Sequence, residues 1–321
     1  MNEKKQKKIL ITGATGLIGQ GLVRHAHNLG MEIIAVTRNK EKAARLFSGI
    51  DGLEILETDI VNMPIADMSL DYIIHAAANT DSKTFVENPV EIINENIAGM
   101  RNVLELSRAN QLESLVFLSS MEVYGTQKDE ALIDEKHASD LDTMNTRFCY
   151  PESKRMCENM CASYAVEYNV PAKVVRLTQS FGPGVLYNDK RVFAEFARCV
   201  IEGKDIVLHT KGETKRMYLF TEDACSAIFT VLFKGKTGEA YNAANESTYC
   251  SIYEMAAMVA DKCAHNSIKV IVEECDISNF GYAPTLKMKL DTSKLKSLGW
   301  NPTTQLDRMF ELMIEDMRKT K

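Results

Sequence analysis

The sequence has no run of apolar residues that approaches the roughly 20 needed to cross a bilayer. It also has only 7 prolines and a single tryptophan among its 321 residues. No low-complexity or proline-rich segment separates one part of the chain from another. These absences argue against a membrane protein and predict lobes that pack closely, with no flexible linker between them.

Cysteine occurs eight times, but never as a Cys-x-x-Cys pair. Cys157 and Cys161 are four residues apart in a helical pattern, with no second pair of ligands, so we expect no metal site. Reduced, buried thiols are the simpler explanation. This usage of cysteine is typical of a cytoplasmic protein, and we expect that location.

The chain has 38 basic and 44 acidic residues, so charge of neither sign dominates and the net charge is −6. There is no long basic block of the kind that binds nucleic acid, and no such partner is expected. The lysines of the segment 4–8 are more simply explained as a solvated tail than as a phosphate-binding arm.

Short apolar segments alternate with helical segments through the first half of the chain. This alternation predicts βαβ units, and hence an α/β fold with a Rossmann-type, doubly wound parallel sheet. Continuous apolar strands such as 32–37 suit a sheet that is covered on both faces. Strands are expected at 8–12, 32–37, 54–57, 72–75, 115–119 and 172–177, and helices at 16–29, 90–109 and 152–168.

The pattern changes after the Gly-Pro-Gly sequence at 182–184. Helices are expected at 192–202, 221–233 and 252–265, mixed with isolated strands. We interpret residues 1–180 as the dinucleotide-binding domain and 181–321 mainly as a smaller α/β substrate-binding lobe. Segments of the second part can return to the main sheet.

A glycine-rich loop follows the first strand and opens the first helix. Gly13 permits a tight turn, Gly16 lets the backbone approach a pyrophosphate, and Gly19 allows the helix to pack closely on the strand. The helix N-terminus then offers free N–H groups to the phosphates. The predicted contacts are Gly13, Thr15, Gly16, Leu17, Ile18 and Gly19.

The end of the second strand predicts which dinucleotide is bound. An acid normally accepts hydrogen bonds from the ribose of NAD at this point, but here Thr37 and Arg38 follow the strand. Arg38 can pair with a 2′-phosphate, which favours NADP(H), with NAD(H) as the alternative. The alternative for Arg38 is a surface arginine at a strand end. Asp59 and Ile60 follow the next strand and are candidates for contacts with adenine, although a solvated loop fits equally well.

The candidate catalytic group combines a strand end with a helix. Ser120 ends a strand, and Tyr150 and Lys154 are four residues apart, on one face of a helix. An ammonium beside a phenol favours phenolate, so Tyr150 is expected to act as an acid or base. A Tyr-x-x-x-Lys spacing is common by chance. It is evidence for a catalytic site here because it occurs together with the glycine loop and Ser120.

These residues resemble the extended short-chain dehydrogenase/reductases that act on nucleotide sugars. The resemblance covers nearly the whole chain, and within the superfamily the segment 147–155 looks most like the UDP-glucuronate decarboxylases. The motifs that carry it also include 75–78 (His-Ala-Ala-Ala), 96–99 (Asn-Ile-Ala-Gly), 181–183 (Phe-Gly-Pro) and 298–300 (Leu-Gly-Trp).

The resemblance implies a role for each matching residue. Tyr150 would take the proton of the sugar C4 hydroxyl while hydride passes to the nicotinamide. Lys154 would bind the nicotinamide ribose, and Ser120 would hold the sugar O4. Further contacts would come from Ala76, Ala77, Ala78 and Asn96 to the cofactor, and from Asn79, Met121, Gln179, Arg191 and Arg216 to the nucleotide sugar. A homodimer through helices 90–109 and 152–168 is also implied.

Glu122 distinguishes between members of the superfamily. The resemblance implies that Glu122 acts near C5, because dehydratases and decarboxylases of the family carry Glu at this offset. The alternative is an ion pair with a nearby Lys or Arg. Three residues depart from the family pattern. Met121 stands where dehydratases often have Asp, Gln179 where an Asn is usual, and Thr37 where NAD enzymes have Asp.

We therefore expect an enzyme that oxidises C4 of a nucleotide sugar and then decarboxylates or dehydrates it. An NADPH-dependent 4-ketosugar reductase or a C4 epimerase is the first alternative. A non-catalytic dinucleotide-sensing module is the second, although it would have no need of Ser120, Tyr150 and Lys154.

Overall fold

The structure is a computed structural model, and it describes residues 6–275 and 285–321. Its main feature is a 7-stranded sheet in the order β11-β7-β5-β4-β1-β2-β3. All neighbouring pairs are parallel, as expected. The strands are β1 (Lys8–Thr12), β2 (Glu32–Thr37), β3 (Leu53–Glu57), β4 (Tyr72–His75), β5 (Ser114–Ser120), β7 (Ala172–Leu177) and β11 (Ala240–Ala243).

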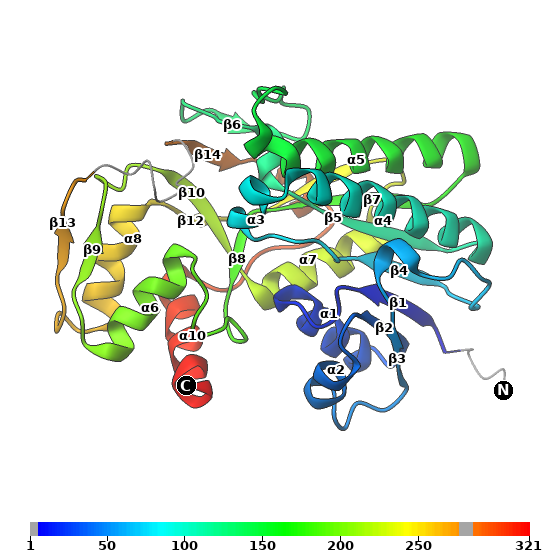
Figure 1. Cartoon of the computed structure of the whole chain (residues 1–321), viewed down its shortest axis with the longest axis horizontal. Helices are drawn as coiled ribbons and strands as arrows, with labels where there is room; N and C mark the ends of the chain where they lie inside the picture. The colour runs from blue at the N-terminus through cyan, green and yellow to red at the C-terminus, as the bar shows by residue number, and fades with distance from the viewer. Residues whose placement is uncertain (1–5, 276–284) are drawn as a thin grey trace.

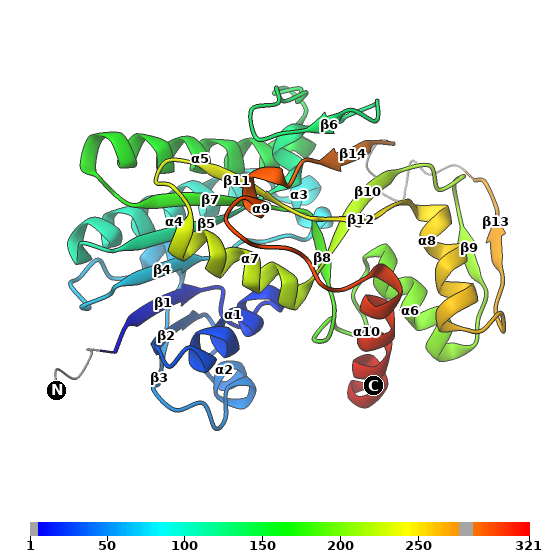
Figure 2. The same ribbon diagram turned by 180° about the vertical axis from the view of Figure 1, so that it is seen from behind.

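Helices cover both faces of this sheet (Figures 1 and 2). One layer contains α1 (Leu17–Asn28), α2 (Lys40–Leu46) and α7 (Thr221–Lys234), and the other contains α4 (Pro89–Asn110) and α5 (Cys149–Tyr168). Successive residues of β1 belong to different layers of the core. Ile9 and Ile11 pack with the α1–α7 layer, while Leu10 packs with the α4–α5 layer. The apolar strands are therefore explained by burial on two faces, and the expected fold class is confirmed.

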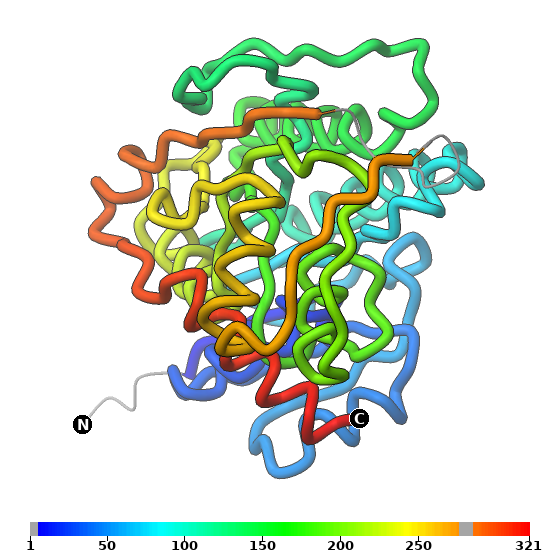
Figure 3. Tube along the Cα trace, turned by 90° about the vertical axis from the view of Figure 1, so that its left-hand side faces the viewer, coloured from blue at the N-terminus to red at the C-terminus, as the bar shows by residue number. Residues whose placement is uncertain are grey.

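The second lobe is built around a smaller sheet in the order β12-β10-β14-β6, with β8 paired to β10 and a separate pair formed by β13 and β9. Its helices enclose a core of their own, in which α10 lies beside α6 (Figure 3). The elements are β6 (Leu132–Ile133), β8 (Gln179–Phe181), α6 (Val192–Glu202), β9 (Ile206–Leu208), β10 (Lys215–Phe220), β12 (Asn245–Ser251), α8 (Ile252–Met258), β13 (Val270–Val272), β14 (Lys287–Leu290) and α10 (Leu306–Thr320).

Two elements that follow residue 181 are part of the main domain. Strand β11 pairs with β7 at the sheet's edge, and α7 packs against α1 and β5. The helix expected at 252–265 is also different in detail. It is α-helical only to the end of α8 and continues as a π-helix, η4 (Val259–Cys263).

The cysteines are all free thiols, and four of them, including Cys157 and Cys161, are buried. In the described ranges, 6–275 and 285–321, no helix has the length and apolar character that a bilayer crossing requires. The outer faces of α4 and α5 still expose apolar side chains. Val90, Ile93 and Met156 are 61%, 42% and 53% exposed.

Candidate active site

The glycine loop lies at the carboxyl ends of the parallel strands, beside the point where β1 separates β2 from β4. Gly13 has a φ of +66°, and a Cβ there would lie 2.8 Å from the backbone of Ala76 and Ala77. A side chain at Gly19 would overlap the Gly13 carbonyl. No side chain caps α1, so the N–H groups of its first turn are left for a ligand. The loop therefore fits a bound pyrophosphate.

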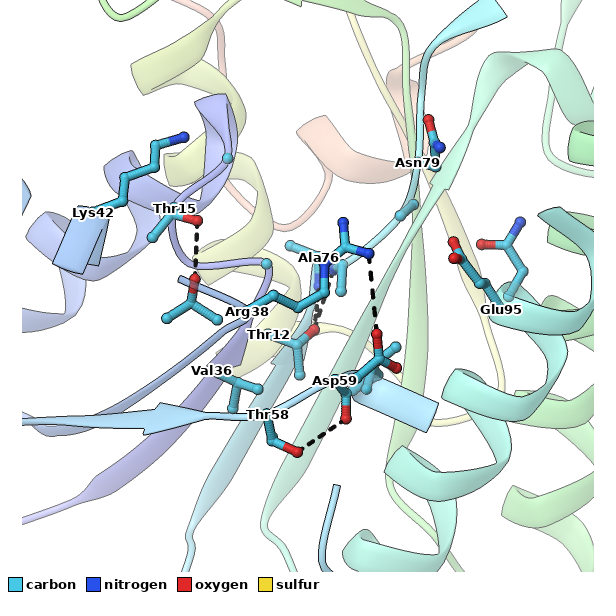
Figure 4. Close-up of a pocket in the computed structure, with 17 residues that line it drawn as sticks. Thr12, Thr15, Val36, Arg38, Lys42, Thr58, Asp59, Ala76, Asn79 and Glu95 are labelled. Carbon is cyan, nitrogen blue, oxygen red and sulfur yellow. Dashed lines mark hydrogen bonds and ion pairs between the residues drawn. The ribbon is translucent and has the colours of Figure 1, made fainter. Parts of the chain in front are cut away.

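A cavity of about 270 Å³ lies along this loop (Figure 4). Most of the predicted cofactor residues line it: Gly13, Thr15, Gly16, Thr37, Arg38, Asp59, Ile60, Ala76, Ala77, Ala78 and Asn96. Leu17, Ile18 and Gly19 are not in its lining, and Leu17 and Ile18 pack against the cores. Asn79, expected to contact the sugar, lines this cavity instead. Five further residues line the cavity that were not predicted to contact the cofactor: Thr12, Val36, Lys42, Thr58 and Glu95.

Two cations lie at the end of the cavity formed by β2 and α2. The Arg38 side chain is 74% exposed and reaches Asp59, with 4.0 Å between Nη1 and Oδ2 (Figure 4). Lys42 lies nearby on the side of Thr15, whose hydroxyl bonds that of Thr37 at 3.2 Å. Asp59 therefore balances Arg38, and Lys42 adds a second positive charge at this end.

The floor of the cavity contains a hydrogen-bonded bridge between β1 and β4. The Thr12 hydroxyl accepts the N–H groups of Ala76 and Ala77, each at 3.1 Å, and lies 2.8 Å from Nδ1 of His75. Because the hydroxyl has one proton to give, it donates that proton to Nδ1, which assigns the neutral tautomer with hydrogen on Nε2. Burial, and secondarily Lys154, lowers the pKa of His75 to about 3.

We expect His75 to make the free energy of unfolding decrease as the pH falls. Its ordinary pKa is 6.5 and its folded pKa is about 3, so between these values only the unfolded chain takes up the proton. The loss should be about 2 kcal/mol at about pH 5. Urea unfolding at two pH values should show a weaker pH dependence for His75→Asn, whereas His265→Asn, at an exposed position, should behave as wild type. An unchanged pH dependence in His75→Asn would contradict the assignment.

Tyr150 lies in the first turn of α5 and is 6% exposed. Its ring stacks on Phe85 of α3 (Ser82–Glu87), with 4.5 Å between centroids and 11° between planes. Burial raises the pKa of the phenol, the negative charge of Glu122 raises it further, and a hydrogen bond with Ser120 acts in the opposite direction. Tyr150 is therefore held protonated in this structure.

Lys154 is also buried, at 3% exposure, and its Nζ donates to the Leu118 carbonyl at 2.8 Å. Burial lowers the pKa of Lys154 to about 8. Its Nζ lies 5.7 Å from the centre of the Tyr150 ring. The expectation that Lys154 lowers the pKa of Tyr150 toward neutral pH is wrong for this structure, because burial is the dominant influence on both groups.

A second cavity, of about 60 Å³, is lined by residues of both lobes, among them Phe148 and Pro151. Tyr150 itself is not in its lining. Met121 and Glu122, predicted to contact substrate, line it together with Arg216. Met121 and Glu122 belong to the 3-10 turn η2 (Met121–Tyr124). Ser120 caps this turn, since its hydroxyl oxygen accepts the Glu122 N–H at 3.2 Å. Arg147 also lines it, and pairs with Glu122 at 3.7 Å. Arg147 belongs to the segment 147–155 that resembles the decarboxylases, but no role was predicted for its side chain.

The remaining predicted substrate residues lie outside the lining of this cavity. Arg191 is held by Asp189, with 2.6 Å between Nη2 and Oδ2, and its guanidinium covers the Phe193 ring. Gln179 has a buried Oε1 without a hydrogen-bond partner. Arg216, which does line the cavity, has a buried Nε that also has no hydrogen-bond partner. Such atoms are rare in folded proteins, and a polar ligand would satisfy them.

Comparison with known proteins finds UDP-glucuronic acid decarboxylases among the similar sequences, and an epimerase and a dehydratase among the similar structures. UDP-glucuronic acid decarboxylase 1 of Xenopus tropicalis is 26% identical over 99% of this chain and 74% of that protein. UDP-glucuronic acid decarboxylase 6 of Arabidopsis thaliana is 27% identical over 97% of this chain and 89% of that protein. Among solved structures, a UDP-glucose 4-epimerase from Thermotoga maritima has a TM-score of 0.83 at 22% identity, covering 98% of this chain and 99% of that one.

A dTDP-glucose 4,6-dehydratase from Streptomyces venezuelae, solved with NAD, has a TM-score of 0.81 at 20% identity and covers 97% of each chain. Residues 9–244, which contain the main sheet and most of both cavity linings, match the family described as "NAD dependent epimerase/dehydratase family". These findings confirm the resemblance to the extended short-chain dehydrogenase/reductases. The chain belongs to the NAD dependent epimerase/dehydratase family.

Proposed function

We propose that the chain oxidises C4 of a nucleotide-linked sugar and then decarboxylates or dehydrates the resulting 4-keto sugar. The observation that carries the proposal is the position of Glu122, which lines the second cavity and acts by its charge on the buried Tyr150. A carboxylate so close to the acid/base residue can act on the carbon next to C4. The relatives named as UDP-glucuronic acid decarboxylases support a decarboxylation as one of the steps.

Each residue has a separate part in this proposal. Tyr150 would accept the C4 hydroxyl proton as a phenolate, which the positive ring charge of a bound oxidised dinucleotide would favour, and Ser120, its hydrogen-bond partner, would hold the same sugar oxygen. Lys154 fixes the strand end through Leu118 and places its positive charge beside Tyr150. The bound oxidised dinucleotide supplies the hydride acceptor and a positive ring charge.

Glu122 acts once C4 is a ketone. A carboxylate on C5 is then β to a carbonyl, so its C–C bond can break with release of carbon dioxide while the electron pair moves to the C4 oxygen. In a dehydration, Glu122 would instead take the C5 proton and pass it to the departing C6 hydroxyl, so that water leaves and a C5–C6 double bond forms. A loss of carbon dioxide or of water from members of a nucleotide-sugar panel, measured by mass spectrometry, would support the proposal.

The same measurement separates the alternatives. A gain of two hydrogens indicates the ketosugar reductase, and an unchanged mass with an altered chromatographic position indicates the C4 epimerase. A protein that binds dinucleotide and converts no member of the panel corresponds to the sensing module. Any of these three results would contradict the proposal.

We further propose that NADP(H) is bound more tightly than NAD(H). Arg38 and Lys42 lie at the end of the first cavity, where Asp59 pairs with Arg38. Removing the cation in Arg38→Ala should weaken NADP(H) binding by about 1.5 kcal/mol, because a charge-assisted hydrogen bond is lost, and should leave NAD(H) binding unchanged. Calorimetric titration measures both. Arg45→Ala, on α2 but outside the cavity lining, is the control, and a wild type that prefers NAD(H) would contradict the proposal.

A homodimer through α4 and α5 is proposed as well. The exposed side chains of Val90, Ile93 and Met156 form an apolar surface on adjacent helices. Ile93→Asp introduces a charge that a buried interface does not tolerate. Sedimentation should therefore show a dimer for wild type and for Leu29→Asp, which alters an exposed leucine at the end of α1, but a monomer for Ile93→Asp. A monomeric wild type at micromolar concentration would contradict the proposal.

The free thiols support a cytoplasmic location, which we propose on that ground. Four of the eight are buried, so labelling of these four by a thiol reagent should be slow in the folded protein and should accelerate in denaturant.

A further inference from the structure

The turn that carries Glu122 is tied to the main sheet at its last residue. Tyr124 ends η2, two residues after Glu122, and is 1% exposed. Its hydroxyl donates to Oδ1 of Asn242 on β11 at 2.7 Å and accepts Nη1 of Arg176 on β7 at 2.9 Å. Burial raises the pKa of Tyr124 to about 12, so the hydroxyl keeps the proton that it gives to Asn242.

Arg176 also bonds the helix that carries the acid/base residue. Its Nε lies 3.0 Å from Oε1 of Glu158, and its Nη2 lies 2.6 Å from Oε2, so the guanidinium holds the carboxylate through two parallel bonds. The two side chains are 14% and 12% exposed and are therefore largely shielded from solvent. Glu158 belongs to α5 and follows Lys154 by one helical turn. Arg176 therefore connects the helix of Tyr150 to the turn of Glu122.

Asn242 completes this set of bonds. It is fully buried, and its Nδ2 donates to the carbonyls of Ile133 at 3.0 Å and Asp291 at 3.1 Å. It also pairs in register with Arg176 across β7 and β11. We call the four side chains the arginine network: Tyr124, Glu158, Arg176 and Asn242. None of the four lines either cavity, so the network acts on the site by position and not by contact with a ligand.

The two ends of η2 are held by different groups. At its start, the Ser120 hydroxyl accepts the Glu122 N–H. At its end, the Tyr124 hydroxyl links the turn to Arg176. Loss of that one hydroxyl would leave Ser120 and the whole of α5 in place, while it would loosen the turn that directs Glu122. Tyr150 and Glu122 are thus supported separately, and the arginine network joins the two supports.

We propose that Arg176 is a positioning residue, which acts through Tyr124 to fix Glu122 relative to Tyr150. The inference rests on the proposed function and concerns the second of its two steps. Oxidation at C4 uses Tyr150 and Ser120, whereas the later loss of carbon dioxide or water uses Glu122. Because a displacement of about 1 Å in a reacting group can cost roughly 10²-fold in rate, a loosened η2 slows the second step and spares the first.

The test is a single-turnover experiment on Tyr124→Phe, with a sugar that the wild type converts. Absorbance of the reduced nicotinamide measures the first step, and mass spectrometry of quenched samples measures the loss of carbon dioxide or water. The first rate should stay within about threefold of wild type and the second should fall about tenfold, so the 4-keto sugar accumulates. Tyr72→Phe is the control, because it removes a hydroxyl that bonds Glu113 at 2.7 Å, remote from both cavities, and should change neither rate.

A double-mutant cycle tests Arg176 itself. Arg176→Lys keeps a positive charge beside Glu158 but lacks the fork that also reaches Tyr124, so it should slow the same step. The combined variant Arg176→Lys/Tyr124→Phe should be no slower than the slower single variant, because both changes break the same link. Thermal unfolding verifies that each variant is folded, and if Arg176→Lys does not fold, the two rates of Tyr124→Phe decide.

The rates distinguish this inference from a general structural role. Equal slowing of both steps in Tyr124→Phe would indicate a loosened fold and would overturn the inference. Unchanged rates, or additive effects in the combined variant, would overturn it as well while leaving the proposed function intact. A wild type that releases neither carbon dioxide nor water from any nucleotide sugar of the panel would overturn the proposed function together with the inference.

Discussion

Tyr150→Phe is expected to abolish reduction of the dinucleotide by the sugar, with a loss of roughly 10²–10⁴-fold in rate. Hydride cannot leave C4 unless the hydroxyl proton also leaves, and Tyr150 is the buried acid/base group bonded to Ser120. Phe keeps the ring that stacks on Phe85, so the fold and the glycine loop should be unaffected. The near-ultraviolet absorbance of the reduced nicotinamide measures the reaction directly.

The matched control is Tyr164→Phe, on the same helix. The Tyr164 hydroxyl donates to Glu105 at 2.8 Å, remote from both cavities, and its loss should leave the rate unchanged. Dinucleotide binding, measured by calorimetry, should be the same in wild type and both variants. A Tyr150→Phe enzyme that still reduces dinucleotide at the wild-type rate would show that another group accepts the proton.

Glu122→Gln is expected to separate the two halves of the reaction. The amide keeps the shape of the side chain but has no basic oxygen, so C4 should be oxidised while the later step stalls. The predicted result is reduced dinucleotide, detected by absorbance, together with a 4-keto sugar that has lost neither carbon dioxide nor water, detected by mass spectrometry. The overall turnover should fall by roughly 10²-fold or more, as is typical when a general base is removed.

Glu130→Gln is the corresponding control, because Glu130 pairs with Lys215 and Lys287 outside the site. Its turnover should equal that of wild type. Full turnover in Glu122→Gln would instead contradict the decarboxylase or dehydratase proposal and favour the reductase or the epimerase. The neutral amide also removes the charge that acts on Tyr150, so the phenol should then be easier to deprotonate.

The sequence predicts the main sheet closely because its strands are buried on both faces. The strands 8–12 and 172–177 were expected at the positions where β1 and β7 are found, since apolar runs bounded by polar residues leave little choice of ends. The glycine loop was predictable for a similar reason. Gly13 and Gly19 occupy positions where a side chain would overlap neighbouring backbone atoms. The glycines in the sequence therefore indicate that two backbone segments approach each other closely.

The chemistry of the site was less predictable from the sequence. The spacing of Tyr150 and Lys154 correctly implied one face of a helix, but it contains no information on burial, which decides the direction in which both pKa values move. Arg147 was not assigned because its position depends on the η3 turn (Thr146–Phe148) and on the ring of Phe85, which is distant in sequence. Contacts of this kind follow from tertiary packing rather than from a repeating pattern.

The return of β11 and α7 to the main sheet limits how the chain can be divided by genetic engineering. A fragment that ends at residue 180 would lack both elements, leaving β7 as an unpaired edge and uncovering the apolar side of β5 and β7. Such edges associate with other chains, so this fragment should aggregate on expression, although it contains the whole glycine loop. Co-expression with the fragment 181–321 should restore solubility by complementation. The two lobes thus depend on each other to fold, and the main domain expressed alone would need strand β11 from the second part of the chain.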